Sequence, residues 1–408
     1  MKGSPVTMAA AISDRPSAST RGSNQMGVRA HNERLVLTLV RRSGPLAKSE
    51  ISRITGLSAQ SVSVIMRALE GEGLLRKGEP KRGKVGQPSV PINLNPDGAF
   101  FFGLKVGRRS SDLILVDFAG DVVARLRHAH PYPDPDDVLR FAVSGVERLT
   151  AGLSSEQRER VTGLGVALPF RMWEWADHLG VDEAVLSGWR DRDVADELSK
   201  HLSFPVHLSN DATAACGAEL VFGDQDKPRE FLYFYVGFFI GGGLVLDNAL
   251  YSGPTSNAAA LGSMPVSIEG ERARHLVDVA SLSILADAVE AAGAAELMEW
   301  EEPTRWRIPP DIRSEWMERA ASGIAQAALS AASLIDFGCV VLDGWMPADM
   351  RADLVRLVNA RIAEIRIEGI EKPSVRAGAV GPDARALGAA SLPLSERFLV
   401  DRSAFSKG

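Results

Sequence analysis

Hydrophobic residues recur with helical spacing in three consecutive segments between residues 32 and 70. The first helix has its apolar stripe at Leu35, Val36, Leu39 and Val40 and stops at Gly44-Pro45. A shorter helix follows, with Ile51 and Ile54 inward and Gly56 at its C-terminal stop. The third helix has Ser58 as a suitable N-cap and an inward stripe at Val62, Ile65, Met66 and Leu69. Helix, short helix, tight turn and helix is the order of a helix-turn-helix.

The outward face of the third helix carries short side chains that can form hydrogen bonds. These candidate DNA-contacting residues are Ser58, Gln60, Ser61 and Ser63, with Arg67 a turn later. Short polar side chains let the backbone of a recognition helix lie deep in the major groove. The alternative is a purely structural three-helix unit, which would more often expose Glu and Lys there. The observed pattern favours a DNA-reading helix.

A basic loop between two short apolar strands follows Gly73. The strands are predicted near residues 74–76 and 90–94, and together with the loop they form a β-wing. The loop supplies the candidate DNA contacts Lys81, Arg82, Lys84 and Gln87, with Lys77 at its start. Lysine and arginine in such a loop mostly contact phosphates, so they position the protein without reading sequence.

From residue 100 onward the pattern changes to alternating strands and helices. An apolar strand at 100–107 precedes a hairpin at 111–127 and an amphipathic helix at 135–153. Further strands are predicted at 161–170, at 204–210 before a helix, and twice within 231–253 around a glycine-rich turn. A strand-and-helix pattern that occurs twice predicts an α/β fold with two lobes and a cleft between them.

Charge is divided unequally along the chain. Residues 1–90 contain 15 Lys+Arg against 6 Asp+Glu, whereas the remaining 318 residues have a balance of −15. A basic segment joined to an acidic body suits contact with phosphates, although a solvated basic face would give the same count. The predicted organisation is a disordered leader at 1–30, a winged helix-turn-helix at 31–95 and a two-lobed α/β domain at 96–408.

Composition excludes several classes of protein. Hydrophobic residues make up 45% of the chain, with no apolar run long enough to span a bilayer and no signal-peptide pattern. We therefore expect a cytoplasmic protein without a membrane partner. Cys216 and Cys339 are far apart and are expected to be reduced core residues. The segment around Trp300 and Trp306 could be a surface insertion or a dimer contact.

Several motifs, taken together in this order, resemble the ROK family of repressors and sugar kinases. They are GQPS in the wing, NDATAA, the GGG turn, LDNALYSG, SNAAALGSMPV and the C-terminal VGPDARALGAA. The resemblance runs from about residue 32 to Ala390. It implies a winged helix-turn-helix joined to an actin/hexokinase-like domain, and a sugar-responsive repressor of carbohydrate metabolism as the function.

The positions that serve nucleotides in the family's kinases are altered here. Lys105 stands where the resemblance implies an acidic residue that organises ATP and metal. The second phosphate turn contains Phe238 and Phe239, whose bulk hinders close backbone approach to a phosphate. We therefore expect no ATP binding, no catalytic residue, no cofactor and no enzymatic activity.

Asp211 matches the family's catalytic base, which in repressors would accept a hydrogen bond from a sugar hydroxyl. Asn210 would add a second polar contact, and Asn257 and Trp189 complete the expected ligand site. The alternatives are a capped strand-to-helix turn for Asn210 and Asp211, and packing for Trp189 and the neighbouring Trp173 and Trp175. The family's Glu and His in ExGH correspond to Ala260 and Ser263, which weakens the expectation that the ligand is an ordinary sugar.

No metal site is expected. The family's zinc cysteines are missing from residues 267–283, and His275 alone cannot form a tetrahedral site. Three functions remain open: a homodimeric or tetrameric DNA-binding regulator tuned by a small ligand in the cleft, a regulator whose body only oligomerises or contacts proteins, and a sugar kinase, which the missing motifs disfavour.

Overall fold

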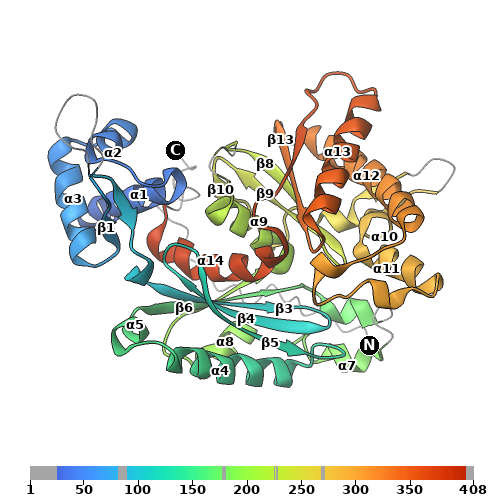
Figure 1. Cartoon of the computed structure of the whole chain (residues 1–408), viewed down its shortest axis with the longest axis horizontal. Helices are drawn as coiled ribbons and strands as arrows, with labels where there is room; N and C mark the ends of the chain where they lie inside the picture. The colour runs from blue at the N-terminus through green and yellow to red at the C-terminus, as the bar shows by residue number, and fades with distance from the viewer. Residues whose placement is uncertain are drawn as a thin grey trace, which may run out of the picture. The chain divides into compact units, whose positions relative to one another are not determined.

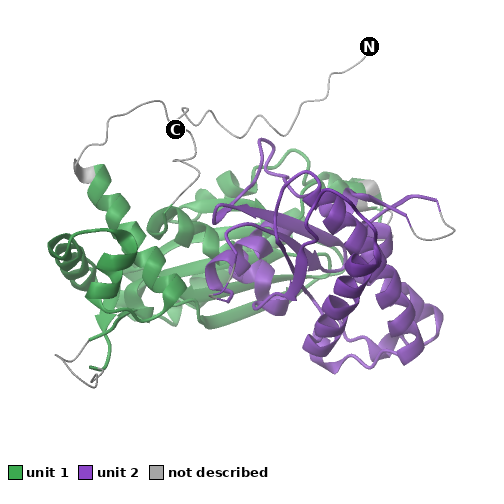
Figure 2. Cartoon of the chain, turned by 90° about the horizontal axis from the view of Figure 1, so that it is seen from above, with its two compact units in different colours: residues 1–211, 389–408 green, residues 212–388 purple. Residues whose placement is uncertain are grey.

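The computed structural model describes residues 25–80, 90–176, 181–224, 226, 228–267 and 272–400. The chain divides into two compact units (Figure 2). Unit 1 comprises Met1–Asp211 with Ala389–Gly408, and unit 2 comprises Ala212–Gly388. Each unit contains one five-stranded sheet, which confirms the prediction of a two-lobed α/β fold.

Unit 1 begins with a small domain that we call the head, residues 25–95. Its helices are α1 (Gln25–Ser43), α2 (Lys48–Thr55) and α3 (Ala59–Gly71), followed by the antiparallel strands β1 (Leu75–Lys77) and β2 (Ile92–Leu94) (Figure 1). The helix-turn-helix order and the two wing strands are confirmed. Residues 81–89, which join the strands, lie outside the described residues.

Local sequence explains the turn between α2 and α3. Gly56 ends α2 with a φ of 72°, a left-handed conformation that glycine adopts without steric cost. The Ser58 hydroxyl then accepts a hydrogen bond of 3.0 Å from the backbone N–H of Ser61 and so caps α3. The expected inward stripe of Val62, Ile65, Met66 and Leu69 is buried, as predicted.

Two expectations for the head were wrong. Ile54 is 47% exposed, because α2 has only eight residues and a single side chain, Ile51, is buried from it. Helix α1 begins at Gln25, within the expected disordered leader, and its buried stripe is Val36, Leu37 and Val40 in place of the predicted set that contained Leu35 and Leu39.

The sheet of unit 1 has the order β5-β4-β3-β6-β7. Its strands are β3 (Phe100–Val106), β4 (Ser110–Asp117), β5 (Val122–Ala129), β6 (Val161–Leu168) and β7 (Val206–Asn210). Strands β3, β4 and β5 form an antiparallel meander, whereas β6 and β7 are parallel to β3. The amphipathic helix predicted at 135–153 is α4 (Pro135–Ala151), which buries Val138 and Ala142 in the same core as Phe102. The shorter helices are η2 (Pro96–Gly98), α5 (Ser155–Glu159), η3 (Met172–Trp175), α7 (Glu183–Ser187) and α8 (Val194–Ser199).

The sheet of unit 2 has the order β10-β9-β8-β13-β14. Its strands are β8 (Phe231–Val236), β9 (Ile240–Leu246), β10 (Ala249–Leu250), β13 (Cys339–Gly344) and β14 (Ser374–Ala377), and a separate small pair is β11 (Pro265–Val266) with β12 (Arg274–His275). The helices are α9 (Asp211–Phe222), η4 (Leu261–Ser263), α10 (Val277–Ala280), α11 (Leu282–Ala291), η5 (Ala295–Leu297), η6 (Pro303–Arg305), α12 (Pro310–Ala332), α13 (Ala348–Glu364) and η7 (Gly381–Asp383). Helix α14 (Ala384–Phe398) begins in unit 2 and ends in unit 1.

The GGG run of β9 has a packing function. A Cβ on Gly243 would lie 2.3 Å from the Cβ of Cys216 on α9, and one on Gly241 would lie 2.7 Å from that of Ala212. Glycine is therefore needed for α9 to pack directly on the sheet, whether or not a phosphate binds nearby. Both cysteines are buried and neither forms a disulfide bond, as predicted. No helix among the described residues is both long and apolar enough to cross a bilayer.

Candidate functional site

Helix α3 presents the candidate DNA-reading residues on its outward side. Gln60, Ser61 and Arg67 are exposed, and Ser63 is half-buried. The Nε of Arg67 donates a hydrogen bond of 3.2 Å to the carbonyl oxygen of Ser63, so this side chain lies along its own helix. Four buried residues anchor the opposite face of α3, leaving the outward face available to a partner.

Ser58 and Ser61 have a structural role at the start of α3. Their hydroxyl oxygens lie 2.9 Å apart, and the Ser58 hydroxyl also accepts the cap hydrogen bond from Ser61. A cap that fixes the first turn also fixes the direction of the first helical N–H groups, which can bind a phosphate. These two serines thus fit better as supports of the helix start than as readers of base edges.

Val64 was missed as a candidate contact. It is 47% exposed and lies on α3 between Gln60 and Arg67, one turn from each. An exposed apolar side chain at this place can contact the methyl group of thymine. The sequence contained the signal, because a stripe at Val62, Ile65, Met66 and Leu69 forces position 64 outward.

The wing is described only at its base. Lys81, Arg82, Lys84 and Gln87 lie outside the described residues. At the base, Arg76 and Lys77 of β1 are exposed, and Lys77 Nζ lies 3.7 Å from a carboxylate oxygen of Glu70 on α3. Strand β1 therefore presents positive charge immediately beside the candidate reading helix.

The expected ligand residues fall into different surroundings. Asn210 ends β7 and Asp211 begins α9, and both are half-buried. Asn257 is exposed in the loop after β10. Trp189 is only 3% exposed in the core of unit 1, and its indole N–H donates a hydrogen bond of 2.7 Å to the carbonyl oxygen of Pro133. This burial favours the packing interpretation, so Trp189 is dropped from the proposed ligand site.

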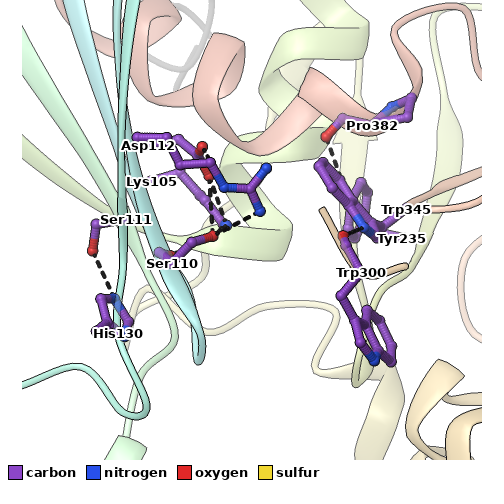
Figure 3. A network of polar contacts seen from close by, with 10 residues as sticks. Lys105, Ser110, Ser111, Asp112, His130, Tyr235, Trp300, Trp345 and Pro382 are labelled. Carbon is purple, nitrogen blue, oxygen red and sulfur yellow. Dashed lines mark hydrogen bonds and ion pairs between the residues drawn. The ribbon is translucent and has the colours of Figure 1, made fainter. Parts of the chain in front are cut away.

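Lys105 belongs to a row of charges across three strands of unit 1 (Figure 3). Antiparallel pairing sets Lys105 of β3 opposite Asp112 of β4, and Asp112 opposite Arg127 of β5. Lys105 Nζ lies 2.9 Å from Asp112 Oδ2 and 3.2 Å from the Ser110 hydroxyl, whereas Arg127 Nε lies 3.6 Å from Asp112 Oδ1. Burial acts to raise the pKa of Asp112, but the nearby Lys105 and Arg127 outweigh it, and the pKa is lowered.

Beside this row, a buried histidine is held neutral. His130 Nε2 lies 3.1 Å from the hydroxyl of Ser111 (Figure 3). Burial lowers the pKa of His130 to about 4, and the charges of His128 and Lys105 act in the same direction. The row therefore keeps its Lys–Asp–Arg charge pattern at neutral pH without a contribution from His130.

In unit 2, the turn between β8 and β9 is bonded to the start of α11. The backbone N–H of Ile240 donates to the Ser281 hydroxyl at 3.1 Å. The carbonyl oxygens of Gly237 and Phe238 accept 3.0 Å hydrogen bonds from the N–H groups of Leu282 and Ser283. The amides at the start of α11, which could otherwise bind an anion, are thus used inside the protein.

Aromatic side chains cover the same turn. The ring centroid of Phe238 lies 5.3 Å from that of Trp300, which lies 5.8 Å from Trp306. The indole N–H of Trp345 donates to the Trp300 carbonyl oxygen at 2.8 Å, and Tyr235 donates to the carbonyl oxygen of Pro382 at 3.2 Å (Figure 3). The expectation of a surface insertion around Trp300 and Trp306 was wrong, because Trp306 is 8% exposed and packs in the core of unit 2.

A side chain of α12 contacts the backbone at Ser267, where the segment begins in which the sequence resemblance implied zinc cysteines. Gln326 of α12 accepts a hydrogen bond from the Ser267 N–H at 2.9 Å and donates one to the Ser267 carbonyl oxygen at 2.6 Å. His275 of β12 is exposed, and residues 268–271 are not among those described. Within the described residues, no three His, Cys, Asp or Glu side chains are grouped to hold a metal.

Comparison with known proteins gives consistent results. Residues 101–280 match the model of the ROK family. The Sinorhizobium fredii protein y4fQ, which is uncharacterized, is 26% identical over 372 residues, or 90% of this chain and 91% of its own. The xylose repressor of Bacillus subtilis is 24% identical over 260 residues, 61% of this chain and 64% of the repressor.

Solved structures agree on the fold. A ROK family transcriptional regulator described as a homologue of the E. coli MLC protein superposes with a TM-score of 0.64 at 19% identity, covering 91% of this chain and 97% of its own. The ROK hexokinase from Thermus thermophilus gives 0.52 at 22% identity and covers 73% of this chain and 99% of its own. Residues 101–280 are therefore similar to the ROK family, and the chain shares the fold of a solved ROK family transcriptional regulator.

Proposed function

We propose that this chain is a sequence-specific DNA-binding transcriptional regulator that acts as a repressor, as the xylose repressors to which it is similar are named. The observation that carries the proposal is α3, a capped helix anchored by four buried side chains that presents Gln60, Val64 and Arg67 to solvent. Glutamine can bond to adenine, arginine to guanine, and an apolar side chain to the thymine methyl group.

The regulator would act as a homodimer or a tetramer. Two heads related by a two-fold axis place two recognition helices in major grooves about 34–36 Å apart, one helical turn of DNA. The operator would then be a pseudo-palindrome. Selection of duplexes from a random library tests this proposal, since a specific reader enriches one motif and a purely structural head enriches none.

The effector would be a sugar or a related metabolite bound at Asp211 and Asn210. In support, the strand-to-helix junction at Asn210 and Asp211 provides a carboxylate and an amide on consecutive, half-buried residues. A ligand that binds one conformation more tightly than another shifts the population of DNA-binding forms.

The chain would not be a sugar kinase. At the position of the kinase acid, Lys105 is 7% exposed and paired with Asp112. At the second phosphate turn, the Ile240 N–H is bonded to Ser281 and Phe238 packs on Trp300. Both features would have to be rearranged before nucleotide phosphates could bind.

A second candidate is a regulator whose body senses no small molecule. It is favoured by Ala260 and Ser263, both exposed, which stand where the ROK sugar clamp has Glu and His. Such a body would serve oligomerisation or contact with a protein, and its heads would bind DNA without an effector.

The Asp211→Ala variant separates these two candidates. We expect at least one compound from a panel of sugars, sugar phosphates and related metabolites to raise the melting temperature of the wild-type chain in a saturable manner. A ligand at a hundredfold excess over its Kd stabilises the folded state by about 2.7 kcal/mol. Because Asp211 would accept hydrogen bonds from the ligand, we expect the variant to lose this response.

The matched control is Asp196→Ala, which removes an exposed carboxylate of α8 that is paired with Lys200. It should respond to the compound as the wild type does. If no compound shifts the wild-type melting temperature, the non-sensing candidate gains support. If Asp211→Ala responds normally, the ligand binds elsewhere.

A further inference from the structure

A buried arginine of the head reaches into the body of unit 1. Arg41, in the last turn of α1, donates hydrogen bonds to the carbonyl oxygens of Phe118 at 2.5 Å and Ala119 at 3.2 Å. Its guanidinium also lies over the Phe118 ring, 5.2 Å from the centroid. Burial lowers the pKa of Arg41 to about 10, so it remains charged at neutral pH. A planar guanidinium can bond two acceptors and stack on a ring at once, which a lysine cannot.

The turn that receives Arg41 is itself fixed. Asp117 Oδ1 accepts three backbone hydrogen bonds of 2.8 to 3.0 Å, from Ala119, Gly120 and Asp121. The N–H of Phe118 donates to the carbonyl oxygen of Pro96 at 3.0 Å. The carbonyl oxygens that Arg41 binds are therefore held in place by hydrogen bonds that do not involve Arg41.

A second arginine makes the reverse contact, from the body to the head. Arg160 follows α5, and its Nη1 lies within hydrogen-bonding distance of three carbonyl oxygens: that of Glu72 in the head at 3.4 Å, and those of Asp97 and Gly98 at 3.2 and 3.3 Å. Glu72 directly follows α3, so this arginine touches the end of the candidate reading helix. A Cβ on Gly73 would lie 2.7 Å from the Arg160 guanidinium, so glycine keeps this approach open.

The end of α14 completes the junction. Phe398 packs on Phe118 with a centroid distance of 5.0 Å and on Phe101 at 5.9 Å. The N–H of Val400 donates to the hydroxyl of Thr38 on α1 at 3.1 Å. The head and this end of α14 both belong to unit 1. The head is joined to β3 through residues 95–99, and these contacts on both sides of that connection make a freely swinging head unfavourable.

We propose that Arg41 and Arg160 form a reciprocal clamp that sets the angle of α3 on the sheet of unit 1, and that they are positioning residues for DNA binding. This inference rests on the proposed function, since the clamp would fix the spacing of two reading helices in an oligomer. A pre-set spacing means that the second head binds without a further loss of orientational freedom.

The variants are Arg41→Met and Arg160→Met, with Arg41→Lys as the conservative change. Arg158→Met is the matched control, because Arg158 also donates three hydrogen bonds to carbonyl oxygens, those of Thr150, Ala151 and Leu153, but all within the body. Loss of fold is checked by comparing the melting temperatures of the four variants with that of the wild type.

The first readout needs no DNA. Spin labels at Ser49→Cys on α2 and Glu147→Cys on α4, in a Cys216→Ala, Cys339→Ala chain diluted with unlabelled protein, report the distance from head to body. The wild type and Arg158→Met should give one narrow distribution, and the clamp variants a broader one. A broad wild-type distribution, or an unchanged one in Arg41→Met and Arg160→Met, would overturn the clamp.

The second readout is binding to the selected operator and to a single half-site. Clamp variants should lose about tenfold or more in affinity for the full operator and little for the half-site. They should also discriminate less against operators with altered half-site spacing. The affinity of Arg41→Lys for the full operator should lie between those of Arg41→Met and the wild type. A clamp variant with wild-type affinity and spacing dependence contradicts the positioning role. Failure of the wild type to select any DNA would instead refute the proposed function and leave the distance measurement valid.

Discussion

Replacing Gln60 or Arg67 by alanine is expected to reduce the affinity for the operator much more than the affinity for unrelated DNA. Each bidentate contact to a base contributes about 1–3 kcal/mol of discrimination, so each variant should lose about 5-fold to 150-fold in the ratio of specific to non-specific affinity. Both side chains are exposed on α3, so neither change removes core packing. Fluorescence anisotropy with operator and scrambled duplexes measures the ratio.

The wing provides the matched contrast. Lys81→Ala and Arg82→Ala should weaken binding to all duplexes alike, and each should reduce the slope of log affinity against log salt by about one. The two sets of variants should differ because α3 would contact base edges, which carry the sequence, whereas the wing would contact phosphates, which do not. If variants in α3 and in the wing behaved alike, the division between reading and positioning residues would be wrong.

The Lys105→Met variant is expected to be strongly destabilised at pH 7. It leaves the buried Asp112 with the weaker electrostatic interactions of Arg127 and Arg125 in place of the direct pair with Lys105. Removing one member of a buried pair costs about 3–5 kcal/mol, because the remaining charge stays desolvated. Urea unfolding at pH 7 measures this loss, which should be largest in unit 1.

The loss should decrease at low pH. In the wild type the pKa of Asp112 is lowered, so its contribution to stability is present above the unfolded pKa of about 3.9 and is lost as pH falls below it. In the Lys105→Met variant we expect burial to raise the pKa of Asp112, because the main opposing charge is gone. The variant should then be destabilised mainly above this raised pKa, where the buried carboxylate is charged. At pH 4.5 the carboxyl can be protonated, and the gap to the wild type should narrow by about 1.4 kcal/mol for each pKa unit.

Lys200→Met is the control for this experiment, since Lys200 and Asp196 form an exposed pair 2.7 Å apart. It should leave the unfolding midpoint unchanged at both pH values. If Lys105→Met were no more destabilising than Lys200→Met, the charge row would not be a buried structural element. The main argument against phosphate binding at the turn between β3 and β4 would then fail.

The head was the most predictable part of the molecule, because an amphipathic helix with a cap and a glycine stop determines its own inward face. The stripe of α3 followed from spacing alone, and the same spacing would have placed Val64 outward. Helix α2 has only two turns, and the spacing of its apolar residues was insufficient to predict its buried face. Ile51 is buried, whereas Ile54 is exposed.

Predictions that depended on tertiary contacts were less reliable. The burial of Trp189 and Trp306 depends on elements that are distant along the chain, such as the Pro133 carbonyl for Trp189. The row of Lys105, Asp112 and Arg127 is an intermediate case. The register of the predicted hairpin at 111–127 would have paired Asp112 with Arg127, whereas the pairing of Asp112 with Lys105 on the strand at 100–107 was not predicted. The side chains of Arg41 and Arg160 bind carbonyl oxygens of residues more than 60 positions away along the chain. Such contacts leave no periodic pattern in the sequence.

Selection of binding sites from a random duplex library tests the central claim most directly. The wild-type chain is compared with a Gln60→Ala, Val64→Ala, Arg67→Ala chain whose melting temperature is unchanged. We predict that the wild type enriches a pseudo-palindrome with half-site centres about 10–10.5 base pairs, or a multiple of that, apart, and that the triple variant enriches none. A wild-type chain that enriches no motif, or a triple variant that enriches the same one, would contradict the assignment of α3 as the DNA-reading element.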